Sequence, residues 1–150
     1  MAMESVTNMI MVNSNPKLDV SPQGDFFRIW AEFLQPIHHL TKREMDVFAA
    51  FLKKRYELSK AITDPDVLDK MLMSEDVKRE IRLQCNMAMK HFQVVMCRFR
   101  QKGVIKNGKI FLNLIPSLTK DGVGLMVYFN FRHEEHIKLG NRAGGQRTGN

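Results

Sequence analysis

The sequence predicts an α+β fold that is mainly helical, with a small antiparallel sheet and extended arms at its N- and C-termini. Two observations support this prediction. Four apolar residues are spaced i, i+3, i+4 and i+7, which places them on one face of a helix: Phe92, Val95, Met96 and Phe99. Asn107 and Gly108 then stand between two short apolar runs. Asn-Gly is the strongest short signal for a β-hairpin, because a type I′ turn needs positive φ at both central residues.

The length and composition fit one folded domain with tails. The chain has 150 residues, of which 44% are hydrophobic and 26% are charged, close to the averages of about 45–50% and about 25% for globular domains. A chain of this length can bury enough apolar surface to form a core without disulfides. We therefore predict an N-terminal arm over residues 1–24, a domain over residues 25–132 and a basic, Gly-rich C-terminal tail over residues 133–150.

The first two predicted helices have clear start signals. One covers residues 25–34, begins near Asp25 and is ended by Pro36. The other begins at Thr41, which forms a capping box with Glu44, and extends to about Tyr56.

Three further helices are predicted before the hairpin. Asp64 followed by Pro65 is typical of a helix start, and this short helix extends to residue 72. Ser74 caps the next helix, and residues 86–90 form the turn into a longer basic helix. Gly103 ends that helix, at a position where a left-handed residue is favoured.

The remaining residues predict three strands. Residues 104–105 and 110–112 flank the Asn-Gly turn. The second strand continues to Leu114 and is ended by Pro116, which cannot donate a backbone hydrogen bond to a neighbouring strand. Residues 119–124 form a polar turn, and apolar residues alternate with others from residue 125 to residue 132. This period of two indicates a half-buried strand, which we expect to pair with residues 110–114 and complete a three-stranded antiparallel sheet.

The region from Ser74 to Leu112 therefore contains a short helix, a turn, a longer helix and a tight hairpin. That order is the pattern of a winged helix-turn-helix, so we predict a winged-helix-like core. The formal charge is +7 at pH 7, and six Lys and Arg residues with no Asp or Glu occur between Asn86 and Lys109. Positive charge is thus concentrated on the helix and the hairpin.

A concentrated basic block favours an acidic partner, nucleic acid first. Gln, Lys and Arg side chains can bind base edges in a major groove, and the lysines of a hairpin can reach the phosphate backbone. The candidate contacts to nucleic acid or to an acidic partner are Lys90, Gln93, Arg98, Arg100, Gln101, Lys102, Lys106 and Lys109.

Two apolar residues interrupt this basic surface. The predicted outward arc of the helix holds Lys90, Gln93, Val94, Cys97, Arg98 and Gln101. Val94 and Cys97 lie in the middle of this arc, where a DNA-reading helix usually presents polar side chains. An apolar pair framed by basic residues suits a protein contact at least as well. The N-terminal arm contains a second apolar run, so the protein-interface candidates are Val94, Cys97, Met9, Ile10, Met11 and Val12. From the residues alone, a nucleic-acid contact and a protein contact both stay open.

No pattern of residues indicates catalysis. Cys85 and Cys97 are the only cysteines and predict neither a disulfide framework nor a zinc site. His133 and His136 are three residues apart, whereas metalloprotease histidines are four apart on a helix. The motifs of serine hydrolases, phosphate-binding loops and dinucleotide sites are missing from the sequence. We predict a protein that is not an enzyme, with no metal, no cofactor and no small-molecule substrate.

The sequence also predicts no membrane partner. It contains no run of about 18 consecutive apolar residues. The N-terminus lacks the basic flank and apolar run of a secretory signal.

Six segments carry a resemblance to a known family: residues 40–47 (LTKREMDV), 54–60 (KRYELSK), 67–70 (VLDK), 73–76 (MSED), 91–96 (HFQVVM) and 105–116 (IKNGKIFLNLIP). They resemble a family of small virion-associated proteins of crAss-like bacteriophages of Bacteroidales. The similarity spans about residues 26–131 and leaves both arms outside.

This resemblance implies a structural protein of the virion, assembled in the cytoplasm of the host bacterium, as a component of the head-to-tail connector. The implied partners are other copies of the chain and phage portal or tail proteins, with DNA as a further contact. A ring of subunits needs two different complementary faces on each subunit. The alternatives are a winged-helix regulator of phage transcription, which binds DNA, and an accessory protein packaged in the virion, because one fold supports many functions.

Overall fold

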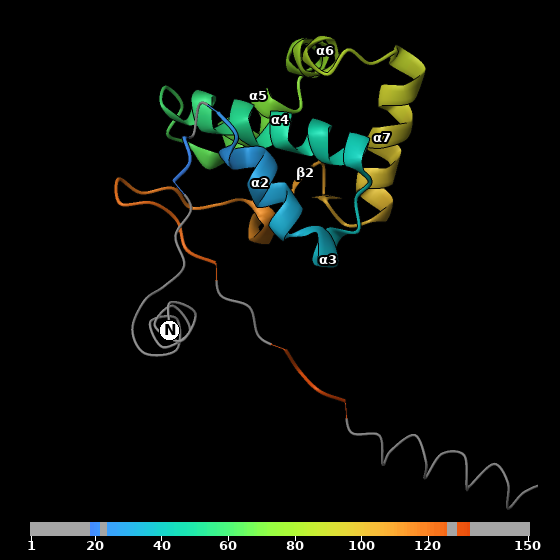
Figure 1. Cartoon of the computed structure of the whole chain (residues 1–150). Helices are drawn as coiled ribbons and strands as arrows, with labels where there is room; N and C mark the ends of the chain where they lie inside the picture. The colour runs from blue at the N-terminus through green and yellow to red at the C-terminus, as the bar shows by residue number, and fades with distance from the viewer. Residues whose placement is uncertain (1–18, 22–23, 126–128, 133–150) are drawn as a thin grey trace, which may run out of the picture. The chain divides into compact units, whose positions relative to one another are not determined.

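The structure is a computed structural model that describes residues 19–21, 24–125 and 129–132 (Figure 1). The chain divides into two compact units, Met1–Pro116 and Ser117–Asn150. The predicted arms lie almost wholly outside the described residues, so their extent stays a prediction, as does the predicted domain end at residue 132.

The first unit is mainly helical and contains one small antiparallel sheet, so the predicted mainly helical α+β class is confirmed. Helix α4 is the longest helix of the described residues and contacts α2, α5 and α6, and in Figure 1 it crosses the middle of this unit. The helices are α2 (Phe26–Phe33), α3 (Gln35–His38), α4 (Lys42–Ser59), α5 (Pro65–Leu72), α6 (Glu75–Gln84) and α7 (Met89–Gln101).

Aromatic rings join α7 to α4 in the core. The ring of Phe99 on α7 lies edge-on to Phe48 and Phe51 on α4, with 6.4 Å between ring centres in each pair. Phe92 lies 6.4 Å from Phe51. Edge-on and tilted rings at this distance are favourable beyond the apolar area they bury. The predicted inward face of the basic helix is confirmed, because all four of its residues are buried: Phe92, Val95, Met96 and Phe99.

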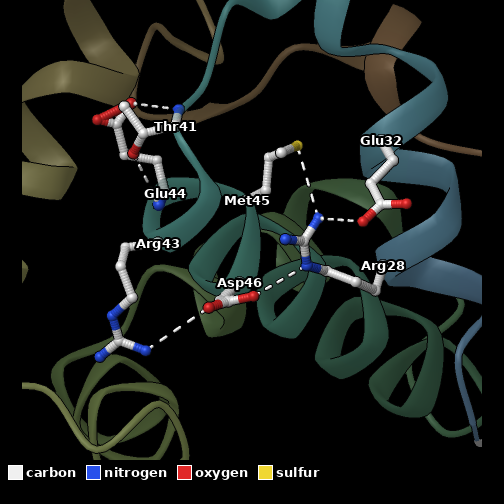
Figure 2. A network of polar contacts seen from close by, with 7 residues as sticks. All are labelled: Arg28, Glu32, Thr41, Arg43, Glu44, Met45 and Asp46. Atoms are coloured by element: carbon white, nitrogen blue, oxygen red, sulfur yellow. Dashed lines mark hydrogen bonds and ion pairs between the residues drawn. The ribbon is translucent and has the colours of Figure 1, made fainter.

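The predicted N-terminal caps are confirmed. The backbone N–H of Glu44 donates to Thr41 Oγ1, and the backbone N–H of Thr41 donates to Glu44 Oε1, which completes the capping box (Figure 2). The side chains of Asp64 and Ser74 accept backbone N–H groups in the first turns of α5 and α6. These contacts satisfy donors that a helix start otherwise leaves unpaired.

Two helix boundaries differ from the prediction. Pro36 does not end the helical region, because it occupies the second position of α3, where a missing N–H costs no hydrogen bond. The chain leaves α3 at His39, whose φ of 56° lies in the left-handed region. Helix α4 also continues beyond Tyr56 to Ser59.

The hairpin forms as predicted at the Asn-Gly turn. Its strands are β1 (Ile105–Lys106) and β2 (Lys109–Ile110), paired antiparallel. Asn107 and Gly108 have φ of 55° and 74°, so both central residues take the positive values that a type I′ turn requires. Gly103 has φ of 77° and ends α7 in the left-handed conformation that we predicted.

The second strand is shorter than predicted. Residues Leu112–Leu114 form the 3-10 helix η1, so the prediction of a strand through residue 114 was wrong. The ring N–H of Trp30 donates to the carbonyl oxygen of Leu114 at 2.9 Å, and Leu114 is buried. This contact turns the chain back toward α2 after the hairpin.

The predicted third strand is not confirmed. The sheet in the described residues has two strands, and Leu125, Phe129 and Phe131 lie outside any strand and are exposed. Residues 126–128, in the middle of the predicted strand, lie outside the described residues. In the second unit, Thr119 and Gly122 form an isolated antiparallel bridge, which agrees with the predicted polar turn.

Candidate interaction surface around helix α7

The turn between α6 and α7 is held by two arginines. Arg82 Nη1 donates to the carbonyl oxygen of Met87 at 3.3 Å, and Arg43 Nη2 donates to that of Cys85 at 2.8 Å. Asn86 takes a positive φ of 49°, and Met87 is buried beneath the turn. Because side chains satisfy the turn carbonyls, the start of α7 is fixed relative to α6 and α4. The sequence patterns did not indicate either arginine.

The side of α7 that faces away from the core exposes both apolar and polar side chains, as the sequence predicts. Val94 is 52% exposed, and Cys97 is exposed beside it on the helix. The polar residues predicted for this arc are also exposed: Lys90, Gln93, Arg98 and Gln101. Lys90 and Arg98 form no ion pair with any other described residue. We call this set of six residues the outward face of α7.

Lys102 does not belong to that face. Its Nζ lies 2.7 Å from Glu44 Oε1 and donates to the carbonyl oxygen of His39 at 2.8 Å. The side chain of Glu44 is only 7% exposed and that of Lys102 is 24% exposed. Lys102 therefore joins the end of α7 to the start of α4, and its charge is matched inside the molecule.

Burial and hydrogen bonding have opposite effects on the pKa of the Glu44 carboxyl group. Burial raises its pKa, but the hydrogen bonds from Lys102 and from the backbone of Thr41 outweigh burial and hold the pKa below its ordinary value. Glu44 is consequently an ionised partner of Lys102 at neutral pH.

The hairpin places two lysines next to each other. Lys106 and Lys109 are paired across the two strands, and both are exposed. Like charges directly opposite each other are unfavourable, but the Nζ of Lys106 lies 4.1 Å from the ring centre of Phe111, a cation–π contact. Both ammonium groups stay at the surface beyond the end of α7.

Arg100 does not belong to the outward face. It lines a groove between α6 and α7, together with three cationic residues of α6: Lys78, Arg79 and Arg82. Gln93 of the outward face also lines this groove. The sequence prediction included Arg100 among the candidate contacts because of its charge, and charge alone does not tell which side of a helix a neighbouring helix will flank.

Polar contacts also join α2 to α4, as Figure 2 shows. Arg28 Nε lies 2.9 Å from Asp46 Oδ1, and Arg28 Nη1 lies 3.2 Å from Glu32 Oε1. Arg43 reaches the second oxygen of Asp46 at 3.6 Å. This network sits on the face of α4 that α2 covers, and it stabilises the packing of the two helices.

His38 is buried within the same region. Its Nε2 lies 2.7 Å from the carbonyl oxygen of Ala31, and the backbone N–H of Leu40 donates to Nδ1 at 2.9 Å. Nδ1 is therefore the unprotonated nitrogen and Nε2 carries the proton. Burial lowers the pKa of His38, although the bond to Ala31 opposes this effect.

The described residues contain neither a cluster of metal-ligating side chains nor a helix that could span a membrane. No group of three or more His, Cys, Asp or Glu side chains in this part of the chain could hold a metal ion. No helix in the described ranges is long and apolar enough to cross a membrane. The interface candidates Met9, Ile10, Met11 and Val12 lie outside the described residues.

Comparison of the chain with protein-family models, curated proteins and solved structures finds no match.

Proposed function

We propose that this chain is a non-enzymatic structural protein of a bacteriophage particle, acting in the head-to-tail connector through a winged-helix-like core. The observation that supports a protein-binding role best is the outward face of α7. Val94 and Cys97 are exposed at its centre, and basic and amide side chains surround them. Protein interfaces combine an apolar centre with a polar rim in this way.

The winged-helix-like description rests on the order and packing of the elements. Helix α6, a four-residue turn, helix α7 and the β1–β2 hairpin follow one another, and Phe99 packs α7 on α4. Recruitment of such a module to hold proteins together needs no change of fold. The virion assignment itself draws on the resemblance to small proteins of crAss-like phages.

Two further apolar side chains are exposed, which is consistent with a subunit that contacts more than one neighbour. Phe33 on α2 and Ile37 on α3 are 58% and 62% exposed, at some distance along the chain from α7. A subunit in a ring uses two different faces for its two neighbours. The outward face of α7 and the Phe33–Ile37 region are our candidates for these two faces.

The experiment compares two valine substitutions. Val94→Glu places a charge at the centre of the outward face of α7, and Val67→Glu makes the same change on α5, where Val67 is 48% exposed. We expect Val94→Glu to weaken capture of the portal or tail protein by about tenfold or more, whereas Val67→Glu retains capture. The measurement is co-sedimentation of the purified full chain with purified portal and tail components, with circular dichroism to check folding.

Equal behaviour of the two variants would refute the role of the outward face. Absence of the protein from purified particles by mass spectrometry would refute the virion assignment as a whole. Presence in particles without a fixed copy number would favour a packaged accessory protein.

A winged-helix regulator of transcription is the second candidate, and the hairpin lysines favour it. Lys106 and Lys109 lie beyond the end of a helix that exposes Gln93 and Arg98, an arrangement in which a helix enters a major groove and a hairpin reaches the backbone. This candidate predicts tight binding to one duplex sequence, with a steep loss of affinity as salt rises and a loss in Arg98→Ala and Gln93→Ala. Weak, equal binding to all duplexes would exclude sequence-specific regulation.

A further inference from the structure

The groove between α6 and α7 contains more positive than negative charge. One carboxylate, Glu75, and four cationic side chains line it: Lys78, Arg79, Arg82 and Arg100. Lys78 pairs with Glu75 and Arg79 pairs with Asp76, each at 3.5 Å. Arg82 and Arg100 form no ion pair with any other described residue. The groove thus offers two guanidinium groups whose charge is not matched within the described part of the chain.

One atom of this set lacks a partner. Arg82 Nε is buried and has no hydrogen bond within the described residues, although Arg82 Nη1 holds the turn carbonyl of Met87. A buried donor without an acceptor is costly. The guanidinium group of Arg82 therefore keeps hydrogen-bonding capacity that the described residues do not use.

The floor of the groove is apolar. Phe92 and Met96 are buried beneath it, and Met89 lines it with 53% of its surface exposed. The groove encloses about 320 Å³, at the small end of the range of about 300–1,000 Å³ for ligand pockets. Methionines adapt to differently shaped apolar groups. The floor therefore suits one or two apolar side chains.

We propose that the α6–α7 groove binds an acidic segment of a partner protein, with an apolar side chain of that segment on the floor and its carboxylates on Arg82 and Arg100. Guanidinium groups bind carboxylates through paired, charge-assisted hydrogen bonds. The proposal rests on the protein-binding function proposed above, and it specifies the chemistry of a second contact, in a groove that borders the outward face of α7 at Gln93.

Nucleic acid fits this groove less well. A phosphate backbone brings closely spaced negative charges but no apolar side chain for the floor. An acidic peptide with an apolar residue satisfies the floor and the two arginines together.

The test uses a fluorescently labelled synthetic peptide with a central leucine–phenylalanine pair between acidic residues. Its binding to the full-length protein is measured by fluorescence anisotropy. Two further peptides separate the contributions: one replaces the acidic residues by their amides, and the other replaces the apolar pair by serine. We expect both changes to weaken binding by about tenfold or more.

Two arginines on the same helix provide a matched pair of variants. Arg100→Glu reverses a charge in the groove, and Arg98→Glu makes the same reversal on the outward face of α7. We expect Arg100→Glu to weaken peptide binding by about tenfold or more, and Arg98→Glu to retain binding within about twofold. Circular dichroism checks that both variants fold.

The apolar floor has its own matched pair. Met89→Ser and Val94→Ser alter side chains of α7 that are 53% and 52% exposed, but only Met89 lines the groove. We expect only Met89→Ser to weaken peptide binding.

Several results would overturn the proposal: no binding of the acidic peptide, equal losses in Arg98→Glu and Arg100→Glu, or no loss in Met89→Ser. Binding of a DNA duplex that Arg100→Glu abolishes would reassign the groove to phosphate. Capture of portal and tail components by the wild-type chain tests the proposed function separately. If the acidic peptide fails while that capture persists through Val94, only the groove proposal is refuted.

Discussion

The pair formed by Glu44 and Lys102 shows how one residue can serve two elements. Glu44 completes the capping box of α4 and also binds the ammonium group at the end of α7. Its side chain is 7% exposed, so removal of its charge leaves Lys102 without its closest partner. A partly buried charge that loses its partner is destabilising.

We predict that Glu44→Gln lowers the free energy of unfolding by about 1–3 kcal/mol, because the amide keeps the shape of the side chain but loses the charge. Urea unfolding followed by circular dichroism measures this loss. Glu32→Gln is the control, since Glu32 is 57% exposed and forms a surface ion pair with Arg28, worth about 0–1 kcal/mol. Equal losses in the two variants would contradict the proposed double role of Glu44.

His38 makes stability depend on pH. Because burial lowers its pKa below the ordinary value, the unfolded chain takes up the proton first as the pH falls. Its contribution to stability is therefore complete above about pH 6.5 and decreases as the pH falls toward the folded-state pKa. Protonation of Nδ1 would also break the hydrogen bond from the backbone of Leu40.

The measurement compares urea unfolding at about pH 7.5 and about pH 5.5. We expect His38→Gln to reduce the difference in unfolding free energy between the two conditions, whereas His91→Gln, at an exposed position of α7, should leave the difference unchanged. An unchanged difference in His38→Gln would assign the pH dependence to other groups.

At the scale of elements, the hairpin is determined by its turn. Gly108 has φ of 74°, and an added Cβ would meet nothing within 4 Å. The cost of a substitution there comes from the backbone conformation and not from a clash. Side chains with a Cβ disfavour the left-handed region by about 1–2 kcal/mol.

We predict that Gly108→Ala lowers the free energy of unfolding by about 1 kcal/mol. Gly124→Ala is the control, because that position also has open space around the added Cβ but no left-handed backbone, so we expect no measurable change. Chemical denaturation tests both variants. A loss in the control of the same size would show that the effect does not come from the turn.

The elements that the sequence predicted correctly depend on neighbours within a few residues. Thr41, Asp64 and Ser74 each bind an N–H in their own helix, and the Asn-Gly turn needs only its own two residues. The shortened second strand depends on a distant residue, because Trp30 binds the carbonyl of Leu114. No pattern of neighbouring residues around Leu114 predicts a contact with Trp30.

The same distinction applies to the candidate surface. Helical periodicity correctly predicted that Val94, Cys97 and Arg98 are exposed, because the inward residues define the opposite side. The charges of Lys102 and Arg100 did not reveal that Lys102 pairs with Glu44 and that Arg100 lines a groove beside α6. Those placements result from how whole helices pack.

At the scale of the whole molecule, the positive charge is divided among separate surfaces. Arg98 belongs to the outward face of α7, Arg100 to the groove and Lys106 to the hairpin, while Lys102 is matched internally. A ligand that contacts only one of these surfaces interacts with only a few of the positively charged side chains. We therefore expect the salt dependence of binding to reveal which surface a partner uses, because its slope counts the charges that the partner neutralises.

The hydrogen bond from Trp30 to Leu114 spans 84 residues and has a consequence for the order of folding. Contacts between distant residues form later than local helices and hairpins, because closing a long loop costs chain entropy. The segment after β2 thus acquires its final position only when α2 has docked. We infer that opening of α2 in the native state releases this segment, so that amide hydrogen exchange should give the same opening free energy for both.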